Sequence, residues 1–261
     1  MKGVILAGGS GSRLHPLTLA ISKQLLPVFD KPLIYYPIST LMLAGVREML
    51  IIVTPQNLDL FRLILGDGSQ FGIQIEFIEQ DAPKGIAHGL ILADNFVQNE
   101  NFALILGDNV FYGAGLGRTL SRYSEINGAH IFTHRVHNPQ SFGVLEVDGA
   151  NKIQSIEEKP KNPTSDQAIV GLYFFDKHAV KFAKQIKPSA RGELEIVDVL
   201  KKYLELNLLN FTQLNLGTAW LDTGTFESLH DAGTFVRLIE ERQGISFGDP
   251  TQIAKSFNWI K

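Results

Sequence analysis

The sequence predicts an α/β fold in which a mostly parallel sheet is flanked by helices and joined to a smaller antiparallel region. Three short segments, residues 2–7, 48–53 and 102–106, are almost entirely apolar, which is typical of strands buried on both faces of a parallel sheet. Segments between them carry apolar residues at helical spacing. From residue 129 onward, strand-like segments follow one another with short turns, which favours antiparallel pairing.

Strands and helices alternate in the first half of the chain. Besides the three buried segments, residues 74–79 alternate between polar and apolar side chains and are predicted as a strand. The helices expected here are residues 32–44, 58–65 and 85–96. Gly45 and Gly66 end the first two helices, since glycine is common just after the last helical turn. Pro37 lies inside the first helix, so we expect a kink or a later start.

The second half is expected to form an antiparallel group of strands and two longer helices. The predicted strands are residues 129–136, 142–147, 152–157 and 168–175. One helix opens within residues 188–196 and runs to about 206, and the last one spans residues 226–243 behind Thr225, a typical N-cap. We expect a single domain over residues 1–261. Its expected parts are residues 1–128, residues 129–225 and a C-terminal helical segment, residues 226–261.

The composition excludes several classes of function. The chain has 24 Lys and Arg against 27 Asp and Glu, so no charge excess indicates binding to nucleic acid or to a membrane surface. It has no cysteine, which excludes disulfides, thiolate metal sites and a cysteine nucleophile. No apolar run approaches the roughly 18 residues of a membrane span, and residues 1–7 are typical of a strand rather than a signal peptide. We expect a cytoplasmic protein without nucleic-acid or membrane partners.

A glycine-rich loop after the first strand predicts an anion-binding site. Gly8, Gly9 and Gly11 remove side chains where the backbone must turn sharply and approach another group. Backbone amides at the end of a central strand can cradle an anion, and Arg13 and Lys23 add two positive charges. The loop lacks the Gly-Lys-Ser/Thr of a Walker A motif and the third glycine of a dinucleotide fingerprint. We expect it to bind a polyphosphate; the alternative is a turn without a ligand.

Two aspartates are candidate ligands for Mg²⁺. Asp108 follows residues 102–106, and ligands of parallel sheets bind at the carboxyl ends of the strands. Asp222 interrupts an apolar stretch and could supply a second carboxylate. The alternative for each is a turn residue that bonds its own backbone. Val110 stands where the Asp-x-Asp motif of a glycosyltransferase would need its second aspartate, which counts against sugar transfer from a nucleotide sugar.

Several motifs carry a resemblance to a known family. Residues 8–14 (GGSGSRL), 22–27 (SKQLLP) and 30–32 (DKP) resemble the signature of sugar-1-phosphate nucleotidylyltransferases. Residues 32–37 (PLIYYP) and 66–68 (GDG) are similar to the glucose-1-phosphate thymidylyltransferase branch, and further similarities extend along nearly the whole chain. The resemblance implies the Rossmann-like nucleotide-diphospho-sugar transferase fold. It also implies that residues 1–128 bind the nucleotide and that the antiparallel part, residues 129–225, binds the sugar.

The resemblance also implies a role for each matching residue. It implies catalysis by Arg13 and Lys23 and binding of Mg²⁺ by Asp108 and Asp222. The residues implied in nucleotide binding are Gly8, Gly9, Gly11, Ser12, Arg13, Gln24, Gln80, Gly85, Ile86 and Asp108. The residues implied in sugar-phosphate binding are Asn109, Gly143, Glu158, Lys159, Ile169, Tyr173 and Arg191.

The implied reaction transfers a thymidylyl group from dTTP to α-D-glucose 1-phosphate, giving dTDP-glucose and pyrophosphate. The attacking sugar phosphate is already an anion, so no general base is needed. The reaction needs in-line alignment of the substrates and cations that reduce the repulsion between two polyanions. The resemblance further implies a homotetramer, feedback inhibition by a dTDP-sugar, and a first step in dTDP-deoxysugar biosynthesis of the dTDP-rhamnose type.

Departures from the family pattern keep other functions open. Residues 84–88 (KGIAH) have a basic residue where thymidylyltransferases usually have an acidic one, which is more similar to uridylyltransferases. UTP is therefore an alternative substrate. Phe142 replaces the commoner tyrosine beside Gly143. A non-catalytic nucleotide-sugar sensor is the alternative from another class, disfavoured because every expected charged position is present. A dehydrogenase is disfavoured by the missing third glycine.

Overall fold

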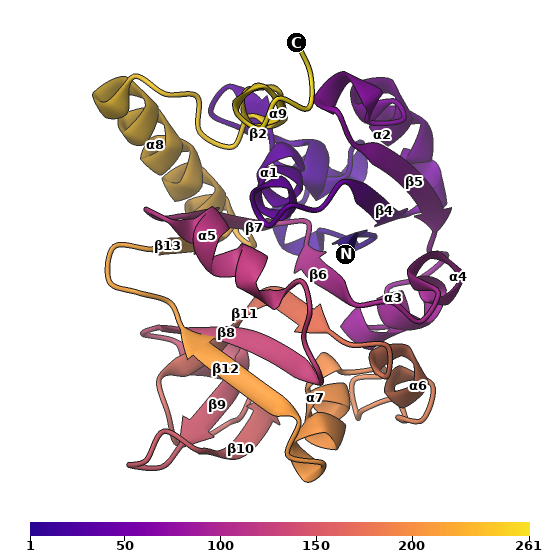
Figure 1. Cartoon of the computed structure of the whole chain (residues 1–261), viewed down its shortest axis with the longest axis vertical. Coiled ribbons are helices and arrows are strands. Elements are labelled where there is room, and N and C mark those ends of the chain that lie inside the picture. The colour runs from indigo at the N-terminus through magenta and orange to yellow at the C-terminus, as the bar shows by residue number, and fades with distance from the viewer. The chain divides into compact units, whose positions relative to one another are not determined.

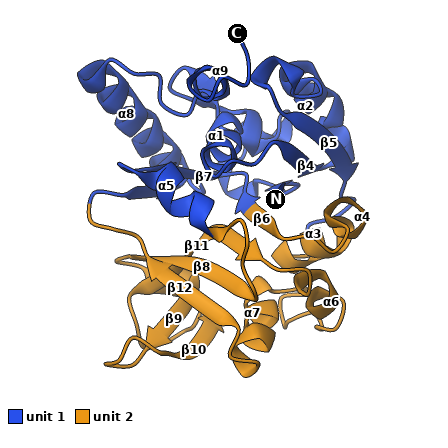
Figure 2. Ribbon diagram, in the orientation of Figure 1, with its two compact units in different colours: residues 1–83, 105–122, 217–261 blue, residues 84–104, 123–216 orange.

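The computed structural model describes residues 1–261, which form two compact units (Figures 1 and 2). Unit 1 comprises residues 1–83, 105–122 and 217–261, and unit 2 comprises residues 84–104 and 123–216. Each unit therefore combines segments that lie far apart in the sequence. The organisation of the whole chain as one domain stays a prediction.

A parallel sheet forms the core of unit 1. Its strands are β1 (Lys2–Ala7), β4 (Glu48–Val53) and β5 (Gln74–Glu79). They pair in the order β1–β4–β5, with Ile5 opposite Ile51 and Ile51 opposite Phe77. The middle of β1 and of β4 is fully buried, as expected for strands covered on both faces. The backbone N–H of Gly107, just after β6 (Phe102–Leu106), donates to the Leu6 carbonyl at 2.9 Å, which places the carboxyl end of β6 beside β1.

Helices and two small antiparallel sheets complete unit 1 (Figure 1). The helices are α1 (Tyr35–Leu43), α2 (Leu58–Leu65), α5 (Leu116–Leu120), α8 (Phe226–Gln243) and α9 (Pro250–Ser256). The small sheets pair β2 (Pro27–Val28) with β3 (Lys31–Pro32) and β7 (Asn109–Tyr112) with β13 (Ala219–Asp222). One face of α8 packs Ala232 and Val236 into a buried cluster with Val28, Leu33 and Val110.

A buried ion pair attaches α8 to β3. Lys31 is only 7 % exposed, and its Nζ contacts Asp30 and lies 2.8 Å from Oε1 of Glu240 on α8. The same Glu240 oxygen accepts a hydrogen bond from the backbone N–H of Phe247 at 2.7 Å. Lys31 belongs to one of the motifs that carry the family resemblance. Its contacts give it a structural role, since a buried ammonium needs anionic partners.

Unit 2 is built on a sheet that is antiparallel except at one edge, where the last strand pairs in parallel with its neighbour. Its strands, from β10 to β12, pair in the order β10–β9–β11–β8–β12. They are β8 (Ala129–Arg135), β9 (Gly143–Val147), β10 (Ile153–Glu158), β11 (Gln167–Phe175) and β12 (Leu209–Gln213). The helices of this unit are α3 (Ile86–Leu92), α4 (Asp94–Val97), α6 (Ala179–Ala183) and α7 (Ile196–Glu205). Every residue of β11 is buried, which makes it the centre of this unit.

The predicted α/β fold class is confirmed, and several element boundaries are corrected. Helix α1 begins at Tyr35 because Lys31 and Pro32 form β3. The helix expected over residues 85–96 is divided into α3 and α4 at Ala93. The four predicted strands of the second half pair in antiparallel fashion as expected, and the unpredicted strand β12 adds a parallel pair with β8. The sequence analysis did not predict the strands β2, β3, β7, β12 and β13 or the short helices α5 and α6, whereas α9 lies in the C-terminal segment that was expected to be helical. None of the helices is long and apolar enough to cross a membrane.

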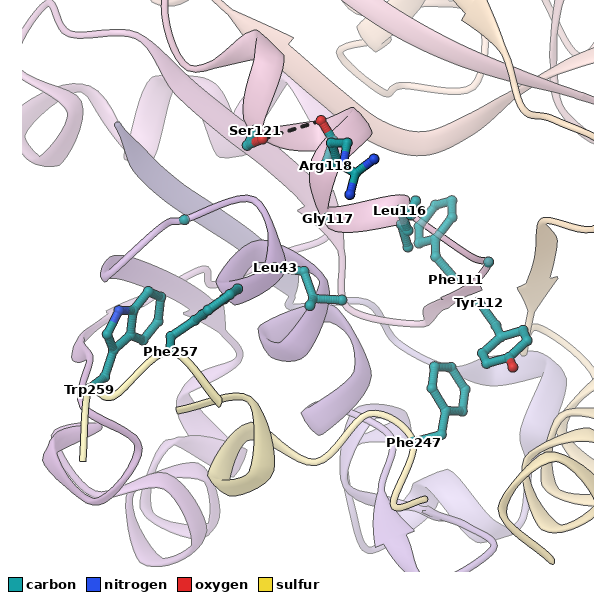
Figure 3. A pocket seen from close by; sticks show the side chains of 13 residues that line it. Leu43, Phe111, Tyr112, Leu116, Gly117, Arg118, Ser121, Phe247, Phe257 and Trp259 are labelled. Carbon is teal, nitrogen blue, oxygen red and sulfur yellow. Dashed lines mark hydrogen bonds between the residues drawn. The ribbon is translucent and has the colours of Figure 1, made fainter. Parts of the chain in front are cut away.

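An apolar cavity in unit 1 has a volume of about 760 Å³ (Figure 3). Its lining comes from β7 and α5 and from the C-terminal segment that carries Phe257 and Trp259, whose rings lie 5.1 Å apart. Arg118 is the only charged residue of the lining. The cavity shares no lining residue with the pocket at the glycine-rich loop after β1, so it is not the predicted phosphate site.

Unit 2 contains a buried histidine on β8. The Nε2 atom of His130 lies 2.9 Å from Thr212 Oγ1, and its ring stacks on Tyr123 at 3.9 Å. Burial lowers the pKa of His130 to about 4, so the imidazole is neutral near pH 7. In the unfolded chain the pKa of a histidine is about 6.5. The neutral His130 therefore stabilises the fold above pH 6.5, and this contribution is lost as the pH falls towards 4.

Replacing His130 tests this linkage. We expect the stability difference between the wild type and His130→Gln to shrink by up to about 2 kcal/mol between pH 7.5 and pH 5, because only the wild type has this group to protonate on unfolding. Urea unfolding of both proteins at the two pH values measures it. Parallel pH dependences would contradict the assignment.

Candidate functional site

The glycine-rich loop after β1 forms a small polar pocket within unit 1. The pocket has a volume of about 190 Å³, and its lining residues are Gly9, Ser10, Gly11, Ser12, Arg13, Lys23, Gln24, Asp108 and Gly224. Gly11 has a φ of +60°, the left-handed conformation that glycine adopts without strain, and its carbonyl accepts a hydrogen bond from Thr18 Oγ1 at 2.8 Å. The structure therefore brings most of the predicted nucleotide-binding residues of this unit into one pocket.

Glycines allow close approach at the walls of this pocket. A Cβ atom on Gly107 would lie 2.7 Å from the Leu6 carbonyl oxygen, and one on Gly8 would lie 2.9 Å from Gln80 Oε1. Gly107 is therefore required by packing, because its neighbour is a backbone atom, whereas the close atom at Gly8 is the end of the flexible Gln80 side chain. Gly9 is different, because a Cβ atom there would have no neighbour within 4 Å. The open side of the loop at Gly9 leaves room for a ligand against the backbone.

Lys23 and Asp108 form the central ion pair of the pocket. Lys23 is 6 % exposed, and its Nζ donates a hydrogen bond of 2.6 Å to Asp108 Oδ2. Burial alone would raise the pKa of Asp108. The Lys23 charge and the hydrogen bonds from Lys23 and Asn109 outweigh burial and hold the pKa below its usual value. The Asp108 carboxylate is therefore ionised at neutral pH.

A chain of two hydrogen bonds orients the Asp108 carboxylate from the other side. The indole Nε1 of Trp220 donates to Asn109 Oδ1 at 2.6 Å, and Asn109 Nδ2 donates to Asp108 Oδ1 at 2.8 Å. Because an indole N–H can only donate, the amide oxygen of Asn109 must face Trp220 and its NH₂ group must face Asp108. This geometry makes Asn109 a support for Asp108; its predicted contact with the sugar phosphate stays a prediction.

Asp222 is the second acidic residue near this ion pair. It lies on β13 opposite Asn109 on β7, and the next residue, Thr223, donates from Oγ1 to the Asp108 carbonyl at 2.9 Å. Its Oδ1 atom is buried without a hydrogen-bond partner. Burial and the neighbouring Asp108 charge raise the pKa of Asp222. A buried carboxylate oxygen that lacks a donor, next to a second carboxylate, is suited to a cation.

The donors present fit Mg²⁺ bound together with a polyphosphate. The structure contains no cluster of three or more His, Cys, Asp and Glu residues that could hold a metal ion. Mg²⁺ commonly takes one or two carboxylates from the protein and completes its shell with water and phosphate oxygens. Asp108 and Asp222 supply that number.

Arg13 approaches Asp222 over a glycine. A Cβ atom on Gly224 would lie 2.8 Å from Arg13 Nη2 and 2.8 Å from Asp222 Oδ1. Arg13 itself is exposed, so its guanidinium is available to an anion at the mouth of the loop. Gly224 was not predicted as a site residue. The Asp-Thr-Gly sequence that ends at Gly224 was the only signal, and the contact depends on the fold.

The predicted sugar-binding residues of unit 2 gather at the paired ends of β9 and β10. Gly143 pairs with Glu158, and a Cβ atom on Gly143 would lie 3.4 Å from Glu158 Oε2 and 3.6 Å from Ile169. Tyr173 on β11 is buried, and its pKa is raised by burial and by the Glu158 charge. Burial and the Glu195 carboxylate raise the pKa of Glu158 in turn.

Two cations lie beside Glu158. The Lys159 ammonium is 3.9 Å from Glu158 Oε1, and Arg191 Nη2 is 3.6 Å from the same oxygen. Lys159 has a φ of +45°, which is uncommon for a residue with a side chain and is often found at functional sites. Arg191 is bound mainly by Glu195, a residue that the sequence analysis missed. The i, i+4 spacing of an arginine and a glutamate was an available signal.

The segment predicted to contact the base is attached to the start of α7. Gly85 has a φ of +97°, and a Cβ atom on it would collide with the backbone of Leu194. Leu194 N–H donates to the Lys84 carbonyl at 2.8 Å, and Ala87 N–H donates to the Leu194 carbonyl at 3.1 Å. These bonds fix Gly85 and Ile86 next to the helix that follows Glu195. Their contact with a base stays a prediction.

Comparisons with known proteins show the family of this chain. The Nucleotidyl transferase family model matches residues 2–238. The chain belongs to this family. The glucose-1-phosphate thymidylyltransferase of Mycolicibacterium smegmatis is 52 % identical over 97 % of this chain and 88 % of the relative. That of Neisseria meningitidis is 51 % identical over 100 % of this chain and 91 % of the relative. The protein is therefore a nucleotidyltransferase.

Solved structures show the same fold. A structure described as a glucose-1-phosphate thymidylyltransferase from Bacillus anthracis, solved with sucrose, has a TM-score of 0.86 and 37 % identity, and covers 97 % of this chain and 99 % of its own. A UDP-glucose pyrophosphorylase solved with UDP-glucose has a TM-score of 0.80 at 23 % identity, covering 91 % of this chain and 98 % of its own. The second similarity concerns the fold alone. The expected nucleotidyltransferase fold is confirmed.

Two glycine substitutions test which glycine of the pocket is required by packing. Gly107→Ala should lower the stability by about 1–3 kcal/mol, because its Cβ atom would collide with the Leu6 backbone. Gly9→Ala is the matched control and should keep the stability within about 0.5 kcal/mol, because its Cβ atom would meet nothing. Thermal unfolding of both variants measures this; equal losses would show that the loop is packed differently.

Proposed function

We propose that this nucleotidyltransferase transfers the thymidylyl group of dTTP to α-D-glucose 1-phosphate and releases pyrophosphate. The names of relatives that are about half identical over nearly the full chain support this substrate pair. The observation that carries the proposal is the ion pair of the buried Lys23 with the half-buried Asp108 in the glycine-rich pocket, with the unpartnered oxygen of Asp222 beside it. A nucleoside triphosphate supplies the anions that this set of charges would bind.

The residues present suit a direct in-line displacement. An oxygen of the sugar phosphate forms a bond to the α-phosphorus of dTTP, and the bond from that phosphorus to the bridging oxygen breaks, so the electron pair leaves with pyrophosphate. The nucleophile is already an anion and gives up no proton. Arg13 and the loop amides would hold the triphosphate, while Lys23 would stabilise charge that develops on the phosphates. Mg²⁺ bound to Asp108 and Asp222 would supply further neutralisation of the phosphate charge.

Unit 2 would bind the sugar phosphate. Glu158 and the backbone of Gly143 offer acceptors and donors to sugar hydroxyls, and the buried Tyr173 and Ile169 support them. Lys159 and Arg191 would bind the phosphate. Gln24, Gln80, Gly85 and Ile86 would contact the base; a glutamine amide can pair with the edge that thymine and uracil share. The homotetramer, feedback by a dTDP-sugar, the cytoplasmic location and the dTDP-rhamnose-type pathway stay predictions.

The wild-type protein provides the first test. With Mg²⁺ and glucose 1-phosphate, we expect pyrophosphate release to be faster with dTTP than with UTP when both are compared at equal concentration. Faster release with UTP would contradict the choice of dTTP and indicate a uridylyltransferase. Lys84 and His88 near Gly85 are the residues that resemble that alternative. No release with either nucleotide would contradict an enzymatic role and favour a nucleotide-sugar sensor.

Removing the charge of Asp222 should separate activity from stability. In Asp222→Asn we expect turnover to fall at least about 100-fold, because one of the two carboxylates that would hold Mg²⁺ against the phosphates loses its charge. The melting temperature should not fall, because the variant removes a negative charge that lies beside Asp108 and has one buried oxygen without a hydrogen-bond partner. Asp59→Asn, at a side chain that is 97 % exposed, is the matched control and should keep both properties. Near-normal turnover of Asp222→Asn would refute the metal assignment.

A further inference from the structure

Arg191 is held by a carboxylate that has no other evident task. Its Nε donates to Glu195 Oε1 at 3.1 Å, and its Nη2 donates to both carboxylate oxygens of Glu195 at 2.9 Å. Glu195 is 6 % exposed and is the N-cap residue of α7, yet its side chain does not cap the helix. An N-cap side chain can accept a hydrogen bond from the free backbone N–H groups of the first helical turn. Glu195 instead accepts its hydrogen bonds from Arg191, which indicates a role towards that residue.

Glu195 is itself fixed in place. Ser189 Oγ donates to Glu195 Oε1 at 2.7 Å, and the Ser189 hydroxyl also accepts from the Arg191 backbone N–H at 3.2 Å. The backbone of this turn closes through Ser189 N–H, which donates to the Glu193 carbonyl at 2.8 Å. The carboxylate therefore has little freedom to rotate. Through it, the guanidinium plane of Arg191 is restrained as well, since a bidentate pair fixes orientation as well as distance.

The restraint leaves one side of the guanidinium free. Every hydrogen bond of the group comes from Nε or Nη2, while Nη1 donates none. The side chain is 37 % exposed, so Nη1 can be reached by a ligand. Glu193 also accepts from Nη2 at 2.9 Å, but its side chain is 41 % exposed and touches Arg191 at this one atom. A solvent-exposed partner of this kind contributes little to orientation.

We propose that Glu195 is a positioning residue that holds Arg191 so that its Nη1 side meets the phosphate of the sugar 1-phosphate. The proposal rests on the proposed function and deepens it. The two carboxylates have different roles: Glu195 fixes the orientation of the Arg191 guanidinium, whereas Glu193 contacts it without fixing its orientation. Arg191 Nη2 already lies 3.6 Å from Glu158 Oε1, so without Glu195 the guanidinium could turn further towards Glu158. This would move a phosphate ligand away and would also engage a sugar-binding carboxylate.

The substitution Glu195→Gln removes the charge and keeps the size. We expect it to raise the KM for glucose 1-phosphate roughly 10-fold or more, as expected for the loss of a charge-assisted bidentate restraint, with the KM for dTTP changed less than about 2-fold. Glu193→Gln is the matched control and should leave both KM values within about 2-fold. Steady-state pyrophosphate release with the full-length protein and Mg²⁺ measures all four constants.

A double-mutant cycle separates positioning from a structural role. If Glu195 acts through Arg191, then Glu195→Gln should cause no further loss of kcat/KM for glucose 1-phosphate in an Arg191→Ala background. Additive losses would overturn the proposal. A lower melting temperature together with equal changes in both KM values would overturn it too, because it would show that Glu195 mainly supports the start of α7.

The proposed function and this inference can fail separately. If the wild type forms dTDP-glucose but Glu195→Gln keeps the wild-type KM for glucose 1-phosphate, the positioning role is refuted and the proposed function stands. If the wild type does not turn over glucose 1-phosphate with either nucleotide, both are refuted.

Discussion

The ion pair of the buried Lys23 with the half-buried Asp108 is the interaction on which the rest of the site depends. A buried ammonium is tolerated only if a carboxylate is held against it and the remaining lone pairs of that carboxylate are satisfied. The structure meets this condition by placing Asp108 after β6, where Gly107 bonds to β1, and by bonding its second oxygen to Asn109. Trp220 then fixes the amide of Asn109. A change at any of these positions would reach the ion pair.

The same part of the structure leaves one carboxylate oxygen without a hydrogen-bond donor. Asp222 lies beside Asp108 with a buried oxygen that lacks a donor, which costs stability in the free protein. A site that binds a polyphosphate with a divalent cation can carry this cost, because the cation supplies the missing partner when the ligand is bound. Unit 2 shows the opposite arrangement: there Arg191 is surrounded by three carboxylates, and one of its terminal nitrogens stays free.

Much of this was predictable from local patterns, and the exceptions have physical causes. The limits of α2, β5, β6 and α8 agree with the periodicity because each has a clear apolar pattern and a turn or cap at its end. The short strands β7 and β13 and the parallel edge strand β12 were not predicted, since their pairing depends on partners far away in the chain. Lys31, which belongs to one of the family motifs, pairs with Glu240 on α8, and no local pattern indicates this contact.

The sequence by itself determined the fold class, the glycine-rich loop, the charged residues of the site and the family, because these depend on periodicity and on motifs that are contiguous in the chain. Only the tertiary structure decided which of those charges meet. Lys23 and Asp108 are 85 residues apart, and Trp220 and Asn109 are 111 apart, so their contacts depend on strand pairing and packing. Burial likewise exists only once the chain has folded. It leaves the Oδ1 atom of Asp222 without a hydrogen-bond donor and restrains the side chain of Glu195.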